Sequence, residues 1–178
     1  MTYRTLHRAG LAAFALLVLA ATPGLAFESP KDAEHVSPDH ALRARVHTDS
    51  HGESSVRIED IRNGAILLIR DDMSKDGAHG HAVVHGAWTP DSQFFVAGLE
   101  SSGPHQPWAH PIWVYSRASN HVVELSTLGL TVVASFQLRP PDILKTRVLS
   151  GGPSGRRSGQ PLTVSLRTLL STGHAPKQ

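Results

Sequence analysis

The chain has 178 residues, of which 40% are hydrophobic and none is cysteine. This length supports one domain with its own hydrophobic core, and the absence of cysteine excludes a fold held together by disulfides. Basic residues number 17 against 15 acidic ones, and two of the basic residues, Arg4 and Arg8, lie in a segment that we expect to be removed. The remaining chain is then formally neutral, which gives nucleic-acid binding no electrostatic support.

The first 26 residues have the three parts of a secretory signal peptide. Arg4 and Arg8 give a positive start, residues 11–21 are apolar, and residues 24–26 (GLA) suit cleavage after Ala26. The apolar run of about 11 residues is shorter than the roughly 20 that a membrane-spanning helix needs. We therefore expect export to the periplasm or the exterior, no further membrane span, and a single β-repeat domain over residues 27–178. An uncleaved anchor is the alternative.

Three turns divide the mature chain, at residues 37–40 (SPDH), 89–92 (TPDS) and 140–142 (PPD). Proline at the second position of such a turn presets type I geometry. Residues 28–36, before the first turn, are polar, and we expect a loosely attached lead-in there. After each turn comes a short strand, and further short strands follow. The expected strands are 41–46, 56–59, 65–70, 93–99, 112–115, 121–125, 143–149 and 162–166.

The turns recur at a nearly constant interval. Pro38, Pro90 and Pro141 are separated by 52 and 51 residues, which is typical of propellers and repeat arrays. This spacing, together with the recurring order of turn, strand and loop, predicts three repeats over about 37–70, 88–125 and 140–170.

The middle repeat resembles a known family. Residues 88–97 (WTPDSQFFVA) and 112–117 (IWVYSR) are similar to the TolB-type β-propeller repeat, in which a Trp-Ser-Pro-Asp-Gly turn precedes an apolar strand and an Ile-Trp-Val-Tyr-Asp strand. The departures are Thr89 for serine, Ser92 for glycine and Ser116 for aspartate. The resemblance is specific only over about residues 85–125. It implies blades of antiparallel strands and does not imply the partners of the Tol system.

The number of repeats argues against a closed ring, because propellers usually need at least four blades. Phe94 and Val96 face one side of the middle repeat and Phe95 and Ala97 the other, so both its faces should be buried. The outer repeats each carry a charged face, with Arg43, Arg45, Arg57, Glu59, Lys145 and Arg147. Residues 65–69, apolar on both faces, do not fit this pattern.

The expected fold class is therefore all-β, an open array or compact stack of three propeller-blade-like antiparallel sheets and not a closed single-chain propeller. We favour a monomer. A two-fold dimer that closes a six-blade ring is the alternative, and the charged outer faces argue against it.

Histidines suggest one alternative function. His79 and His81 would share a face of a strand, and His-x-His on a strand is a zinc arrangement. His85 is about 13 Å from His81 along a regular strand and cannot share the ion unless the strand bulges. A third ligand, His105 or His110, would complete a zinc or copper site. This alternative is a metal-binding protein or a metal-dependent enzyme.

The long loop over residues 100–111 is the candidate binding segment. It carries Trp108 between His105 and His110, and tryptophan is common at the centres of binding interfaces. The competing interpretation is that Trp108 covers the end of a sheet.

Catalytic motifs are absent from the sequence. No Gly-x-Ser-x-Gly elbow is present, and residues 151–155 (GGPSG) lack the Gly-Lys-Ser/Thr ending of a phosphate loop. We therefore expect no catalytic residues and no resident cofactor. The predicted function is that of a non-catalytic binding module in the cell envelope. It would contact a protein or an envelope component through the loop 100–111 or an exposed sheet edge.

Overall fold

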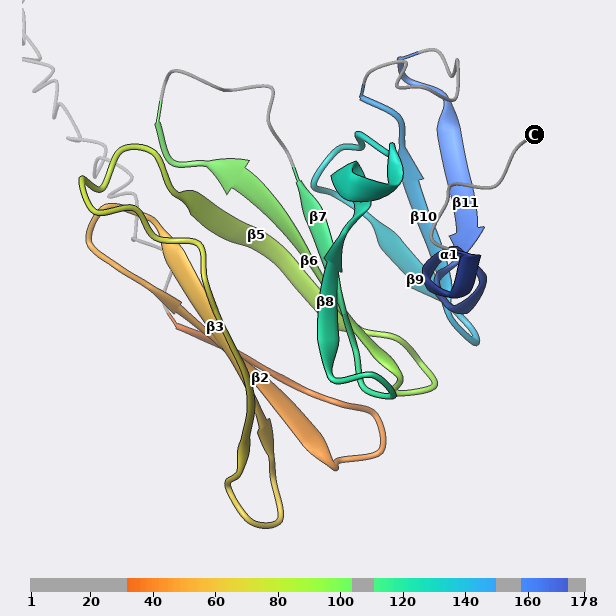
Figure 1. Cartoon of the computed structure of the whole chain (residues 1–178), viewed down its shortest axis with the longest axis horizontal. Helices are drawn as coiled ribbons and strands as arrows, with labels where there is room; N and C mark the ends of the chain where they lie inside the picture. The colour runs from red at the N-terminus through yellow and green to blue at the C-terminus, as the bar shows by residue number, and fades with distance from the viewer. Residues whose placement is uncertain (1–31, 104–110, 150–157, 173–178) are drawn as a thin grey trace, which may run out of the picture.

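The computed structural model describes residues 32–103, 111–149 and 158–172, which form three antiparallel sheets stacked face to face (Figure 1). The predicted signal peptide lies outside the described residues. No helix in the described ranges is long and apolar enough to cross a membrane.

Each sheet is a simple up-and-down meander. The first sheet has the order β1 (Ala33–Val36), β2 (Leu42–Thr48), β3 (Ser54–Asp60), β4 (Ile66–Asp71). The middle sheet has the order β5 (His81–Trp88), β6 (Phe94–Ser101), β7 (Ile112–Ser116), β8 (His121–Glu124), and the 3₁₀ helix η1 (Leu125–Leu128) follows it. The third sheet has the order β11 (Pro161–Ser165), β10 (Ile143–Arg147), β9 (Gln137–Arg139), and helix α1 (Leu166–Thr172) follows β11.

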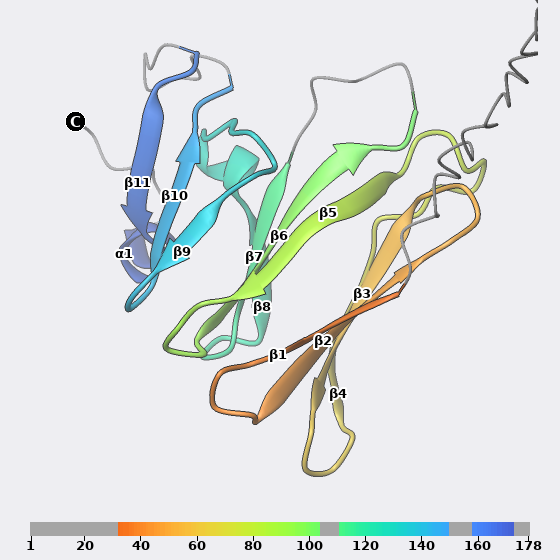
Figure 2. The ribbon, with the colours of Figure 1, turned by 180° about the vertical axis from the view of Figure 1, so that it is seen from behind.

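These sheets confirm the predicted fold class, an open all-β stack of three blade-like sheets. Each sheet takes its first strand from the residues before its turn, so β1, β5 and β9 lie on one side of the stack (Figure 2). The expectation of a loose lead-in before the first turn was wrong for residues 33–36, which form β1. This strand pairs with β2, and the Trp88 indole Nε1 of the middle sheet donates a hydrogen bond to the His35 carbonyl at 2.8 Å.

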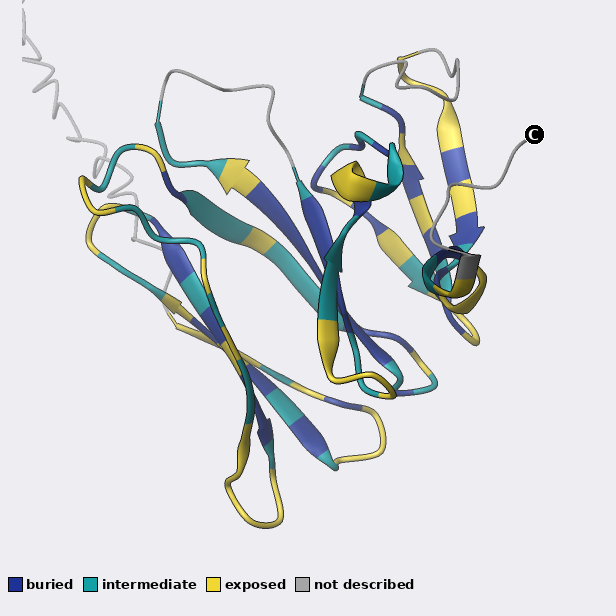
Figure 3. Ribbon diagram, in the orientation of Figure 1, coloured by how far each residue is buried: buried dark blue, intermediate teal, exposed yellow. Residues whose placement is uncertain are grey.

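The core consists of two apolar clusters, one on each face of the middle sheet. Phe94 and Val96 pack toward the third sheet, whereas Phe95 and Ala97 pack toward the first. Residues of β6 and β7 are therefore almost all buried (Figure 3). The alternation along β6 correctly predicted a sheet that is covered on both sides.

The outer face of β2 and β3 is charged, as expected, but one of its charged side chains is buried. Arg45 and Arg57 are half exposed, but Glu59 is only 5% exposed. Its carboxylate accepts a hydrogen bond from Arg43 Nη2 at 2.9 Å and lies within 4 Å of the other two guanidinium groups. The three arginines thus cover the acid that they neutralise.

A bulge accounts for the apolar run in β4. The pairing of β3 with β4 shifts between Ile58 and Glu59, and the shift places both Ile66 and Ile69 on the outer face. These two side chains are 51% and 60% exposed, whereas Leu67 and Leu68 pack against the core.

The first two turns share one hydrogen-bond arrangement. The Ser37 hydroxyl donates to Asp39 at 2.6 Å and accepts the Leu42 N–H at 2.9 Å. In the second turn Thr89 does the same with Asp91 at 2.7 Å and with the Phe94 N–H at 3.0 Å. Each hydroxyl therefore closes a turn and starts the strand that follows.

The fourth residue of each of these turns has a left-handed backbone. His40 has φ 56° and Ser92 has φ 61°. Such angles favour glycine, which adopts them without strain, so these two side chains stand at a demanding position.

The Thr89 hydroxyl offers a test of the turn arrangement. Thr89→Val keeps the shape of this buried side chain but leaves the Phe94 N–H without its partner, so we expect a loss of about 1–3 kcal/mol in the free energy of unfolding. Urea denaturation measures this loss. The matched control is Thr163→Val at an exposed position of β11, for which we expect a change within about 0.5 kcal/mol. Equal effects of the two substitutions would contradict the proposed role of the hydroxyl.

Candidate functional site

The predicted binding loop joins β6 to β7, and the structure describes its base. His105, Trp108 and His110 lie outside the described residues, so their predicted roles stay predictions. The base consists of residues 101–103 on one side and Pro111 on the other. The Leu99 N–H donates to the Pro111 carbonyl at 2.9 Å, which joins the two sides.

Glu53 organises the base of this loop. It precedes β3, it is fully buried, and its carboxylate accepts hydrogen bonds from three segments. The Ser74 N–H and hydroxyl bind it, the Gly80 N–H binds it at 2.7 Å, and the Ser102 hydroxyl binds it at 2.7 Å. One side chain of the first sheet therefore holds both the β4–β5 connection and the start of the loop on the middle sheet.

Two glycines leave the space that this close packing needs. A Cβ atom at Gly80 would collide with the Glu53 carboxylate, and one at Gly103 would collide with the Ala78 carbonyl. The Ser102 N–H also donates to the Gly80 carbonyl at 3.0 Å. The start of the loop is thus fixed by backbone contacts as well as by Glu53.

Glu53 is ionised at neutral pH. Burial alone would raise the pKa of its carboxyl, but the hydrogen bonds from Ser74, Ser102 and Gly80 outweigh burial and lower the pKa to about 2. This buried charge was missed from the sequence, because Glu53 sits in a polar loop and its partners lie 21, 27 and 49 residues away. Only Gly80 and Gly103, where a side chain would not fit, could have indicated the close packing around it.

Only two of the four predicted metal ligands, His79 and His81, lie within the described residues, so the predicted metal site stays a prediction. His79 lies in the β4–β5 connection, where its Nδ1 is 2.6 Å from Asp76 Oδ2. His81 begins β5 and pairs with Ser101. Across the described parts of the chain, no group of three histidine, aspartate or glutamate side chains is placed to hold a metal ion. The other two predicted ligands, His105 and His110, fall outside those parts.

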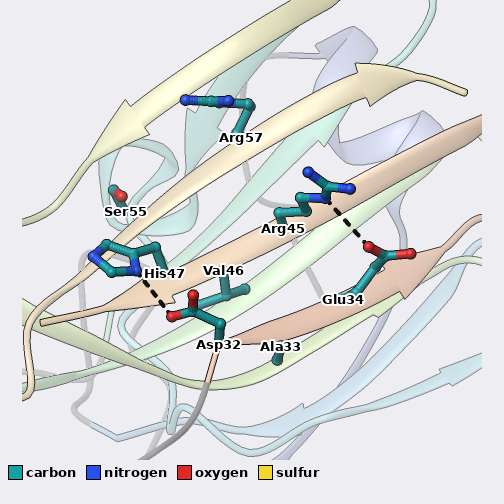
Figure 4. Close-up of a pocket in the computed structure, with 8 residues that line it drawn as sticks. All are labelled: Asp32, Ala33, Glu34, Arg45, Val46, His47, Ser55 and Arg57. Carbon is teal, nitrogen blue, oxygen red and sulfur yellow. Dashed lines mark hydrogen bonds and ion pairs between the residues drawn. The ribbon is translucent and has the colours of Figure 1, made fainter. Parts of the chain in front are cut away.

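A polar groove of about 490 Å³ crosses the outer face of the first sheet (Figure 4). Its acidic side is formed by Asp32 and Glu34, and its basic side by Arg45 and Arg57, which are direct neighbours across β2 and β3. Glu34 lies 3.2 Å from Arg45 Nε, and His47 Nδ1 lies 2.9 Å from Asp32. The acids and bases of this groove therefore largely satisfy one another.

Comparisons with known proteins find only distant structural similarity. No protein-family model matches it, and no curated protein does either. Among solved structures it is similar to TolB from Acinetobacter baumannii, with 12% identity, a TM-score of 0.42, and coverage of 75% of this chain and 29% of that one. A putative TolB from Agrobacterium tumefaciens gives 14% identity, a TM-score of 0.39, and coverage of 68% and 39%.

A chain from a study of two prolyl endopeptidases gives 11% identity, a TM-score of 0.46, and coverage of 77% and 20%. This chain therefore spans well under half the length of each of these proteins. At such values the similarity assigns neither a family nor a function.

The Glu53 anchor predicts a distinct response to acid. Because the pKa is lower in the folded protein than its ordinary value of 4.5, the carboxylate stabilises the fold above about pH 4.5, and this contribution disappears as the pH falls toward 2. Glu53→Gln should lower the free energy of unfolding at pH 7 by about 1.5–3 kcal/mol and should remove this part of the acid sensitivity. Urea denaturation between pH 7 and pH 2.5 measures both effects.

The matched control is Glu34→Gln on the half-exposed edge of the first sheet, where we expect a loss below about 1 kcal/mol. An acid profile that Glu53→Gln leaves unchanged would show that Glu53 does not carry the effect.

Proposed function

We propose that this chain is a non-catalytic binding module of the cell envelope, exported to the periplasm or the exterior. It contacts a protein or an envelope component through the loop 100–111, with His105, Trp108 and His110 as contact residues. The predicted signal peptide supports export, and the repeat architecture supports a scaffold that presents loops.

The single observation that carries this proposal is the anchoring of the loop base by Glu53. A buried, fully hydrogen-bonded carboxylate fixes Ser102, and the bond from Leu99 to Pro111 fixes the far side. A binding loop with a fixed base loses less conformational entropy when it meets a partner. The stack would thus serve as a rigid support for a short recognition segment.

Trp108 is the residue that we expect to contribute most to binding. A tryptophan in a loop buries a large apolar area against a partner, and its indole N–H can donate a hydrogen bond. The histidines on either side add polar contacts.

Site-specific photo-crosslinking tests the proposal. With p-benzoylphenylalanine at position 106, two residues before Trp108, in cells that export the chain, we expect one discrete adduct, whereas the same group at exposed Thr163 on the third sheet gives none. Adding Glu53→Gln should weaken the adduct at position 106, because the loop base is released.

Two results would contradict the proposal. One is the same set of adducts at both positions. The other is stoichiometric zinc or copper in the purified mature chain that His81→Ala abolishes, which would favour the metal-binding alternative through His79, His81 and His105 or His110.

A further inference from the structure

Strand β4 forms one edge of the first sheet and carries exposed isoleucines. It pairs with β3 only, at the end of the order β1-β2-β3-β4. The turn that joins β3 to β4 projects from the foot of the stack in Figure 3, where it is exposed. Among the described residues, three of the five exposed large hydrophobic side chains lie on this turn and on β4, namely Ile61, Ile66 and Ile69. Single exposed apolar side chains are ordinary, but a group of them on one edge indicates an interaction surface.

The backbone of Ile69 is open to an added strand. In an antiparallel pair, successive residues point their N–H and C=O groups alternately toward the partner strand and away from it. The Asp72 N–H donates to the Ser54 carbonyl at 3.1 Å, so Asp72 and Arg70 point toward β3. Ile69 lies between them and points its N–H and C=O away from β3, where no other element of the described residues binds them. A strand laid beside β4 would meet both groups.

Contacts with the middle sheet hold β4 in place. The Arg70 guanidinium donates to Glu124 of β8 at 2.6 Å and lies over the Trp113 ring, 5.4 Å from its centroid. The Asn120 amide donates to the Leu67 carbonyl at 3.2 Å. An edge that is already fixed loses little conformational entropy when a further strand pairs with it.

The other edges of the three sheets are less suited to an added strand. β1 and β8 have four residues each and β9 has three, and β11 begins with Pro161, which has no N–H, and runs into α1. β5 is longer, but the first sheet binds the N–H groups of His81 and Val83 at its edge. Short strands, proline and covering segments are the usual protections of a sheet edge.

Basic side chains border the exposed isoleucines. Arg57 of β3 is half exposed, whereas its partner Glu59 is buried, and Arg62 is 77% exposed where its partner Asp60 is 14% exposed. A partner would therefore meet the guanidinium groups and not the acids beneath them. Among the described residues Arg57 makes no hydrogen bond, only the ion pair with Glu59 at 3.7 Å, so its donors can bind a further carboxylate. The exposed acid of β4 is Asp71, at the far end of the strand.

We propose that β4 is a docking edge for an extended segment of another protein, which joins the first sheet as a fifth strand. The segment pairs with the backbone of Ile69 and places apolar side chains beside Ile66 and Ile69. Its acidic side chains bind Arg57 and Arg62. Backbone hydrogen bonds supply affinity, and the apolar and acidic positions select the partner. This surface shares no residue with the loop 100–111, so it stands independently of the function proposed above.

A synthetic peptide tests the edge in the chain without residues 1–26. The probe Glu-Thr-Ile-Thr-Ile-Thr-Glu, acetylated and amidated, places its isoleucines and glutamates on one face of a strand. Nuclear magnetic resonance spectra should show shifts that saturate below about 1 mM peptide and that are largest in β3 and β4. N-methylation of both isoleucines removes the N–H groups that face β4 and should abolish these shifts.

Variants separate docking at β4 from non-specific binding. Ile69→Thr keeps a strand-forming residue and should weaken peptide binding at least about threefold, and Ile66→Thr serves if the first variant fails to fold. The matched control is Val84→Thr, at an exposed apolar position on β5, which should leave binding unchanged. A peptide with lysines in place of both glutamates should bind at least about threefold more weakly.

Four results would overturn the proposal. They are the absence of saturable shifts in β4, equal binding of the N-methylated peptide, equal binding of the lysine peptide, and equal effects of Ile69→Thr and Val84→Thr. A dimer of the chain alone that Ile69→Thr disperses would also overturn it, because the occupant of the edge would then be a second copy.

Discussion

Burial of the middle sheet on both faces is the constraint on which the rest of the structure depends. Phe95 and Trp113 are fully buried against the first sheet, and Val96 and Val114 against the third. Burying one such side chain contributes about 1.5–3 kcal/mol. Each outer sheet buries only one face, so neither has a core without the middle sheet. The stack is therefore one cooperative unit whose stability is concentrated at two junctions.

Ion pairs at the first two turns add a contact between neighbouring sheets at the end of each junction. Arg117 of the middle sheet binds Asp39 of the first turn, and Arg167 of α1 binds Asp91 of the second. The third turn differs, because Asp142 is buried and accepts hydrogen bonds from the Ser165 hydroxyl and the Arg167 N–H. Its carboxylate is satisfied by Ser165 of β11 and Arg167 of α1, and α1 follows β11 in the chain where the other sheets continue into a fourth strand. The third sheet thus has the character of a capped end of the array.

The sequence was most informative where side chains alternate along a strand and least where contacts are long-range. The two-faced apolar pattern of β6 predicted its burial, and Pro90 marked its turn. Strand β1 was missed, because it is short and polar and its pairing depends on β2 and on Trp88. The outward positions of Ile66 and Ile69 depend on a bulge that no local sequence pattern predicts. The buried charge of Glu53 was missed for the same reason, since its hydrogen-bond partners come from distant loops.

The stack is open, with the outer faces of the first and third sheets in contact with solvent. Light scattering of the chain without residues 1–26 tests it most directly. We expect the mass of one chain over a wide range of concentrations at neutral pH. A stable mass of two chains would contradict it, because a closed six-blade ring would bury the charged faces that carry Arg57 and Lys145.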